Sequence, residues 1–245
     1  MKYEEFSWYS PHLEREMKIR IYGHYGPAFV AFPCQGGLSD DFYINGMIDR
    51  LSDYIESGRM KLFCVDANDD ETVSSENPDK GYRSYKLEMF HQYFVEEAVP
   101  FIKDQQGGYE EIYLIGLSMG ASHAVNQFLR RPELYSGCIG ISGRYDMTQF
   151  FDYWIDENLY NNSPVHYLAG MPKDHYYIDI YNSKKVFIEV GCGAYEYLVR
   201  DSNVRLAEIC EEKGIHFDFE FWDENTIHDW VSWFYSLPYF LDKII

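Results

Sequence analysis

The chain is poor in basic residues. Among its 245 residues it has 21 Lys and Arg against 40 Asp and Glu, which gives a formal net charge of -19. A strongly acidic protein repels the phosphates of nucleic acids and the headgroups of anionic membranes. We therefore expect neither a nucleic acid nor a membrane among its partners.

Cysteines are also few, and long apolar runs are missing. The five cysteines are scattered, odd in number and without a Cys-x-x-Cys pair, which does not fit a disulfide framework or a zinc site. Residues 1–5 lack the apolar core of a signal peptide, and no run of 18 apolar residues occurs. These absences predict a cytoplasmic protein, and nothing in the sequence indicates a metal or another cofactor.

Carboxylates gather in one polar loop, at residues 66–71. Their spacing is not the regular spacing of ligands in a calcium loop. We therefore expect these side chains to form a solvated surface.

Aromatic residues are abundant, with 23 Tyr and 17 Phe, and the hydrophobic share of 46% is ordinary for a globular protein. A chain of this length is long enough for one domain with a substantial core. Many of the tyrosines must be partly exposed or line a cleft. The sequence leaves the formation of a homo-oligomer open.

Strand-like and helix-like patterns alternate along most of the chain. We predict strands at residues 18–22, 28–32, 61–65, 112–115, 138–141, 186–190 and 216–222. We predict helices at residues 43–55, 82–103, 121–130, 203–213 and 229–245. This alternation predicts an α/β fold, with a mostly parallel sheet and helices on both of its faces. The irregular segment 144–182 is expected to form a small lid over the site.

One short motif suggests catalytic chemistry. Gly116-Leu117-Ser118-Met119-Gly120 reads G-x-S-x-G and lies between the predicted strand at 112–115 and the predicted helix at 121–130. In a nucleophile elbow the serine occupies a strained turn between strand and helix, which exposes its hydroxyl. Side chains at the two glycines would collide with neighbouring elements. We predict Ser118 as a nucleophile.

A serine hydroxyl needs a base to accept its proton and an acid to orient that base. His228 is the best placed of the eight histidines, because it follows the last strand, and sites of open parallel sheets lie at the carboxyl ends of strands. Glu196 is the first carboxylate after the strand at 186–190, and we favour it as the acid. The alternatives for the acid are Asp201, Asp223, Glu224 and Asp229.

An oxyanion hole requires two backbone N–H donors. One is expected from Met119, the residue after the nucleophile. The other is expected from the loop after the strand at 28–32, which contains Gln35, Gly36 and Gly37. The sequence does not distinguish among these three residues.

Taken together, these residues resemble the putative-esterase (esterase D-like) branch of the alpha/beta-hydrolase superfamily. The resemblance rests on the elbow at 116–121, on Ile139-Gly140-Ile141-Ser142-Gly143 with Tyr145-Asp146, and on His228-Asp229-Trp230 with Trp233. It extends from about Ser10 to the end of the chain. It implies that residues 1–245 form a single alpha/beta-hydrolase domain.

The chain departs from that branch at two positions. Many members carry His-Gly in the oxyanion loop, where this chain has Gln35-Gly36. Many members also use aspartate as the acid, where this chain has Glu196.

The resemblance implies a serine carboxylesterase that hydrolyses a small or aromatic ester through an acyl-enzyme. We expect Tyr145, Trp154 and Trp230 to contact the small-molecule substrate. Two alternatives remain open at this point. One is an acyltransferase that uses the same triad, and the other is a non-catalytic binding module that retains the fold and the serine.

Overall fold

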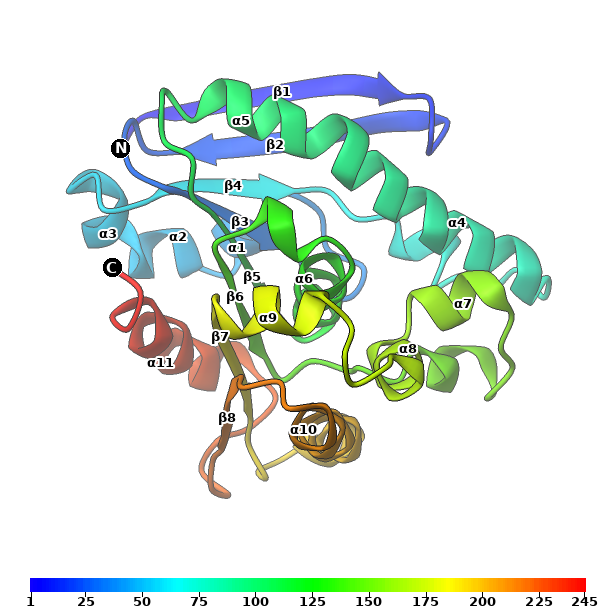
Figure 1. Cartoon of the computed structure of the whole chain (residues 1–245). Helices are drawn as coiled ribbons and strands as arrows, with labels where there is room; N and C mark the ends of the chain where they lie inside the picture. The colour runs from blue at the N-terminus through cyan, green and yellow to red at the C-terminus, as the bar shows by residue number, and fades with distance from the viewer.

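The computed structural model describes all residues, 1–245. Eight strands form one sheet in the order β1-β2-β4-β3-β5-β6-β7-β8 (Figure 1). The strands are β1 (Tyr3–Ser10), β2 (Arg15–Tyr22), β3 (Ala28–Phe32), β4 (Lys61–Val65), β5 (Ile112–Leu117), β6 (Gly137–Ile141), β7 (Lys185–Val190) and β8 (Asp218–Phe221). The β1–β2 and β2–β4 pairs are antiparallel and the other pairs are parallel. The predicted α/β class with a mostly parallel sheet is confirmed.

Eleven α-helices connect and cover these strands. They are α1 (Asp41–Ile44), α2 (Met47–Arg50), α3 (Ser52–Glu56), α4 (Lys80–Tyr93), α5 (Val99–Gln105), α6 (Met119–Arg130), α7 (Glu157–Asn161), α8 (Pro164–Gly170), α9 (Tyr177–Asn182), α10 (Arg200–Lys213) and α11 (Trp230–Leu241). Helices α1 to α3 and α11 lie on one side of the sheet, and α4 to α6 and α8 to α10 lie on the other (Figure 1).

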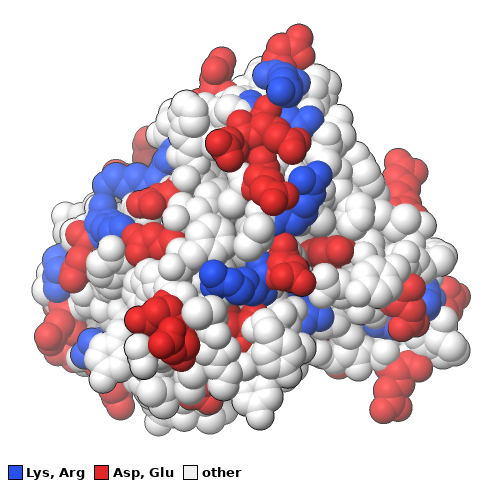
Figure 2. Space-filling model, turned by 90° about the horizontal axis from the view of Figure 1, so that it is seen from below, with Lys and Arg blue, Asp and Glu red and all other residues white.

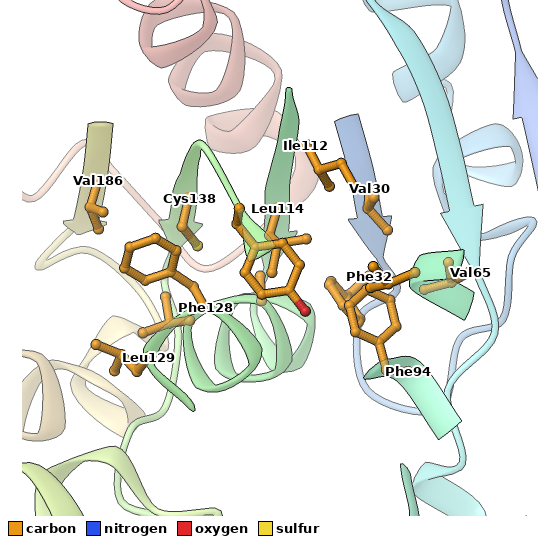
Figure 3. Close-up of a cluster of buried hydrophobic side chains, with 14 of the residues drawn as sticks. Val30, Phe32, Val65, Phe94, Ile112, Leu114, Phe128, Leu129, Cys138 and Val186 are labelled. Atoms are coloured by element: carbon orange, nitrogen blue, oxygen red, sulfur yellow. The ribbon is translucent and has the colours of Figure 1, made fainter. Parts of the chain in front are cut away.

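The central strands are buried on both faces. In β3, Phe29 belongs to the apolar cluster under α1 to α3 and α11, whereas Val30 and Phe32 belong to the cluster on the opposite face. Figure 3 shows part of the cluster on the opposite face, where Phe128 of α6 lies beside Cys138 of β6. Double burial explains why this strand reads as an unbroken apolar run.

The strand predicted at 18–22 is part of β2, but no strand is predicted from the sequence at the position of β1, the other strand of this antiparallel hairpin. Exposed and half-buried residues alternate along β1 at the edge of the sheet, so its sequence lacks a continuous apolar run. The predicted helix at 43–55 is wrong as a single element. Gly46 adopts φ +80 between α1 and α2, and this left-handed residue interrupts the helix.

The long predicted helix at 82–103 is present as α4 and α5 joined by a π-helical turn, Phe94–Ala98. Pro100 follows directly after the first residue of α5 and has no N–H to donate to the preceding turn. A π turn is a common way to accommodate such a local break without ending the helix.

Segment 144–182 is more regular than expected. It contains a 3₁₀ turn at Met147–Phe151 and helices α7, α8 and α9. Helix α7 packs on α4, and α8 packs on α6 and α10. The role of this segment as a lid stays a prediction.

The surface has mixed charge. On the face seen from below, acidic side chains are scattered and the basic side chains between them form no continuous patch (Figure 2). None of the helices is at once long enough and apolar enough to cross a bilayer.

Burial in the core predicts a large cost for truncating Phe128, which exposes none of its surface. We expect Phe128→Ala to lower the free energy of unfolding by about 3 to 5 kcal/mol, because it removes apolar contacts and leaves a cavity. Urea denaturation measures the change. Phe221→Ala is the control, because Phe221 is 43% exposed. Equal losses in the two variants would contradict this account of the core.

Candidate active site

Ser118 occupies a sharp turn between β5 and α6. Its backbone angles are φ +55 and ψ -122, and its N–H donates to the carbonyl of Ile141 over 2.9 Å. A non-glycine residue in this region is strained and persists only where the surrounding structure holds it. A Cβ at Gly116 would lie 2.0 Å from the carbonyl oxygen of Gly120, and one at Gly120 would lie 2.3 Å from that of Phe32. The prediction that both glycines are required for lack of space is confirmed.

His228 reaches the serine from the loop between β8 and α11. The Oγ atom of Ser118 lies 2.8 Å from Nε2 of His228. The backbone N–H of His228 donates to the carbonyl of Ala194 over 2.9 Å, and the indole of Trp233 packs edge-on against the imidazole at 5.2 Å. His228 is therefore held both by the loop that carries Glu196 and by the first turns of α11.

Glu196 is the carboxylate that approaches His228. Its Oε1 lies 3.6 Å from Nδ1 of His228, and the Glu196 side chain is fully buried. This separation is longer than a hydrogen bond, and neither Nδ1 of His228 nor Oε2 of Glu196 has another partner. Catalytic hydrogen bonds of unliganded enzymes are often long and tighten when a substrate binds. Asp229, one of the alternatives, instead caps α11 by accepting the N–H of Val231.

Ser142 is a residue of the site to which the sequence assigned no role. It follows β6 with φ +54, and its hydroxyl donates to Oε1 of Glu196 over 2.5 Å. The indole N–H of Trp233 donates to the same hydroxyl over 3.2 Å. Trp233 and Ser142 thus form a chain of hydrogen bonds that orients the carboxylate of Glu196. The only sequence signal was their presence in the stretches that resemble the esterase branch.

The loop after β3 contains one candidate oxyanion donor with a free N–H. The N–H of Gly36 donates to Oδ2 of Asp69 over 3.1 Å, and that of Gly37 donates to the carbonyl of Cys34 over 2.8 Å. The N–H of Gln35 makes no hydrogen bond within the protein, nor does that of Met119 at the start of α6. Of the three loop residues, Gln35 therefore fits the role of oxyanion donor best. Gly36 and Gly37 do not fit it, because their N–H groups already have acceptors within the protein.

The three aromatic residues expected at the substrate lie in different surroundings. Tyr145 exposes none of its surface, so the prediction that it contacts substrate is wrong. Its ring packs beside Gly143, against the face of the sheet covered by α6. Trp154 is half-buried and stacks on Phe151, beside the apolar cluster that includes Met119. Trp154 stays a predicted substrate contact.

Trp230 is half-buried at the first position of α11. Its ring meets that of Trp233 edge-on at 5.4 Å, and Trp233 in turn borders His228. Its contact with substrate stays a prediction. Two aromatic residues that the sequence did not single out, Tyr195 and Tyr197, flank Glu196 and are exposed.

The predicted solvated surface at 66–71 is wrong for two of its carboxylates. Asp66 and Asp69 are buried, at 9% and 2% exposure. Asp66 accepts the N–H groups of Ser39 and Lys18 at 2.8 and 2.9 Å, so hydrogen bonds compensate its burial. Asp70, which follows Asp69 in the sequence, fits the prediction as an exposed partner of Arg15, and Glu71 is partly exposed. The structure contains no group of three or more His, Cys, Asp or Glu side chains placed to hold a metal ion.

Glu189 on β7 is a second buried carboxyl near the acid. It is fully buried, and neither of its carboxyl oxygens has a hydrogen-bond partner. Burial, with smaller contributions from the negative charges of Glu196 and Glu220, raises the pKa of Glu189 to about 8. Glu189 is therefore mostly protonated at neutral pH.

The sequence also matches the model of a known protein family. Residues 10–243 match the model of the family described as Putative esterase. The chain belongs to this family. Membership supports a carboxylic ester hydrolase. No curated protein sequence matches the chain.

Solved structures of other proteins share the fold. A ferulic acid esterase superposes with a TM-score of 0.75 at 16% identity, over 98% of this chain and 97% of that one. An S-formylglutathione hydrolase from Agrobacterium tumefaciens gives a TM-score of 0.71 at 13% identity, over 98% and 94%. MPT51 from Mycobacterium tuberculosis gives 0.72 at 12% identity, over 100% and 98%. These similarities show the alpha/beta-hydrolase fold.

The raised pKa of Glu189 predicts a pH-dependent cost of folding. Its carboxyl titrates near 4.5 in the unfolded chain and near 8 in the folded protein, so folding takes up a proton between these values. Relative to Glu189→Gln, which stays neutral, the wild type is most stable below pH 4.5. The free energy of unfolding of the wild type, measured relative to that of Glu189→Gln, then falls by up to about 1.4 kcal/mol per pH unit until pH 8.

Urea denaturation of both proteins at pH 5, 6, 7 and 8 would measure this difference. Glu208→Gln is the control, because Glu208 is an exposed partner of Arg205. Parallel stability curves for the wild type and Glu189→Gln would contradict the assignment of Glu189 as a neutral buried acid.

Proposed function

We propose that the protein is a serine carboxylesterase that hydrolyses small or aromatic esters through an acyl-enzyme on Ser118. The observation that carries the proposal is the 2.8 Å approach of the Ser118 hydroxyl to Nε2 of His228. Family membership and the buried Glu196 on the far side of the imidazole support it. A binding module would have no need to maintain the strained turn at Ser118.

In the first half-reaction, Oγ of Ser118 attacks the ester carbonyl carbon while Nε2 of His228 accepts the hydroxyl proton. The carbonyl oxygen becomes negative and receives hydrogen bonds from the N–H groups of Met119 and Gln35. Glu196 stabilises the imidazolium that forms. The tetrahedral intermediate then collapses, and the alcohol leaves with the proton returned by His228.

The second half-reaction repeats these steps with water. His228 takes a proton from a water molecule, whose oxygen attacks the acyl carbon bound to Ser118. The same two N–H donors stabilise the second oxyanion. Release of the carboxylic acid restores the serine hydroxyl, with its proton again supplied by His228.

The surroundings of the triad favour small or aromatic groups in the ester. Tyr195 and Tyr197 are exposed on either side of Glu196, and Trp154 lies beside the cluster that contains Met119. Flat apolar rings of this kind bury acyl or alcohol groups of similar shape.

The test is an assay of p-nitrophenyl acetate hydrolysis, in which the release of p-nitrophenol is measured. We expect Ser118→Ala to lower kcat by about 10⁴-fold or more, because no acyl-enzyme forms. Ser183→Ala is the matched control, since Ser183 is exposed and bonds only to the carbonyl of Ile180. A fluorophosphonate should label the wild type and the control but not Ser118→Ala. Equal hydrolysis rates in wild type and Ser118→Ala would end the proposal.

A further inference from the structure

We propose that Asp69 and His123 are positioning residues that hold the oxyanion loop, residues 33–41, against the start of α6. They would set the distance between the two N–H donors of Gln35 and Met119. This inference rests on the proposed function, because it concerns the oxyanion hole of that reaction. Neither residue is assigned contact with the substrate.

The carboxylate of Asp69 bridges two elements that are far apart in the sequence. Its Oδ2 accepts the N–H of Gly36 over 3.1 Å, and its Oδ1 lies 2.9 Å from Nε2 of His123 on α6. Both side chains are buried, at 1% exposure for Asp69 and 5% for His123. A carboxylate accepts but does not donate, so Nε2 of His123 carries the proton in this contact.

Two further carboxylates hold the same loop at other points. Oδ2 of Asp41 accepts the N–H of Cys34, and Oδ1 of Asp66 accepts the N–H of Ser39, each over 2.8 Å. Gln35 thus lies between two residues whose N–H groups are fixed, while its own N–H has no partner. This pattern fits a loop whose backbone is fixed on both sides of a donor that is available to a ligand.

Asp69 differs from the other two carboxylates in what its second oxygen binds. Asp41 is part of the loop, and Asp66 connects the loop to β2 through the N–H of Lys18. Asp69 connects the loop to α6, whose first residue is Met119. His123 lies one helical turn beyond Met119, so the bridge joins the segments that carry both donors.

The surroundings of His123 keep this bridge rigid. Its imidazole lies 5.0 Å from the ring of Phe90 and 6.2 Å from that of Phe32, the last residue of β3. The loop also packs closely on the helix, since a Cβ at Gly120 would lie 2.8 Å from the carbonyl oxygen of Pro33. A shift of about 1 Å in a catalytic group can cost about 100-fold in rate.

Steady-state kinetics of Asp69→Asn test the role of this bridge. The amide cannot accept hydrogen bonds at both positions, so we expect kcat for p-nitrophenyl acetate to fall by about 10- to 100-fold, while KM changes by less than about threefold. Asp70→Asn is the matched control, because it removes the same charge from the same turn. Asp70 is 64% exposed and pairs with Arg15, and we expect it to change kcat by less than about twofold.

Variants of His123 give an independent comparison, which also serves if Asp69→Asn does not fold. His123→Leu removes the donor to Asp69 and should lower kcat as Asp69→Asn does. The side-chain amide of His123→Gln can place a donor near the position of Nε2 and should recover most of the activity. Equal kcat values for the Leu and Gln variants would contradict the bridge.

Two further measurements separate positioning from a general loss of stability. A trifluoromethyl ketone forms a hemiketal with the nucleophile and places an oxyanion in the hole, so its inhibition constant should rise by about the factor by which kcat falls. Amide hydrogen exchange across residues 33–39 should be faster in Asp69→Asn and His123→Leu than in the wild type and Asp70→Asn.

The outcomes distinguish this inference from the proposed function. A folded Asp69→Asn with the kcat and exchange rates of Asp70→Asn overturns the inference and leaves the esterase proposal standing. A loss of kcat with unchanged affinity for the ketone also overturns it. A wild type that hydrolyses no ester and does not react with fluorophosphonate overturns the proposed function, whereas faster exchange in the variants would still support the bridge between loop and helix.

Discussion

The site depends on one strained turn, in which the chain passes from β5 into α6 with Ser118 at φ +55. This turn places the serine hydroxyl above the edge of the sheet and leaves the first N–H of the helix free. It also brings the helix so close to the end of β3 that Gly120 has no room for a side chain. The same local geometry therefore arranges the proposed nucleophile, the proposed oxyanion donor Met119 and the loop after β3.

Carboxylates perform most of the positioning around this turn, and they do so from buried places. Glu196 faces the imidazole of His228, Asp69 connects the loop to the helix, and Asp66 fixes the loop to β2. Each of these acids accepts hydrogen bonds from N–H or O–H groups, which compensates for its removal from water. Glu189 has no such partners, and it stays neutral instead. The acidic composition thus serves the interior as well as the surface.

The sequence predicted best the elements whose environment is uniform. Strands at 28–32 and 61–65 were predicted to the residue, because strands buried on both faces read as apolar runs. Ser118, His228 and Glu196 could be proposed from their order and their loop positions, and the structure brings them together. The roles of Asp69 and Ser142 could not be predicted, because each depends on which N–H or carboxylate group lies nearby in space. The burial of Tyr145 could not be predicted from the sequence either, since tyrosines occur both in protein cores and in binding sites.

The parallel order of the central strands has a consequence for biosynthesis. Neighbouring parallel strands are joined by long crossovers, so the groups of the candidate site come from distant stretches, and His228 follows Ser118 by 110 residues. A nascent chain on the ribosome therefore contains Ser118 long before the imidazole that contacts its hydroxyl has been translated. The contact between Ser118 and His228 therefore cannot form before the segment that follows β8 has been translated.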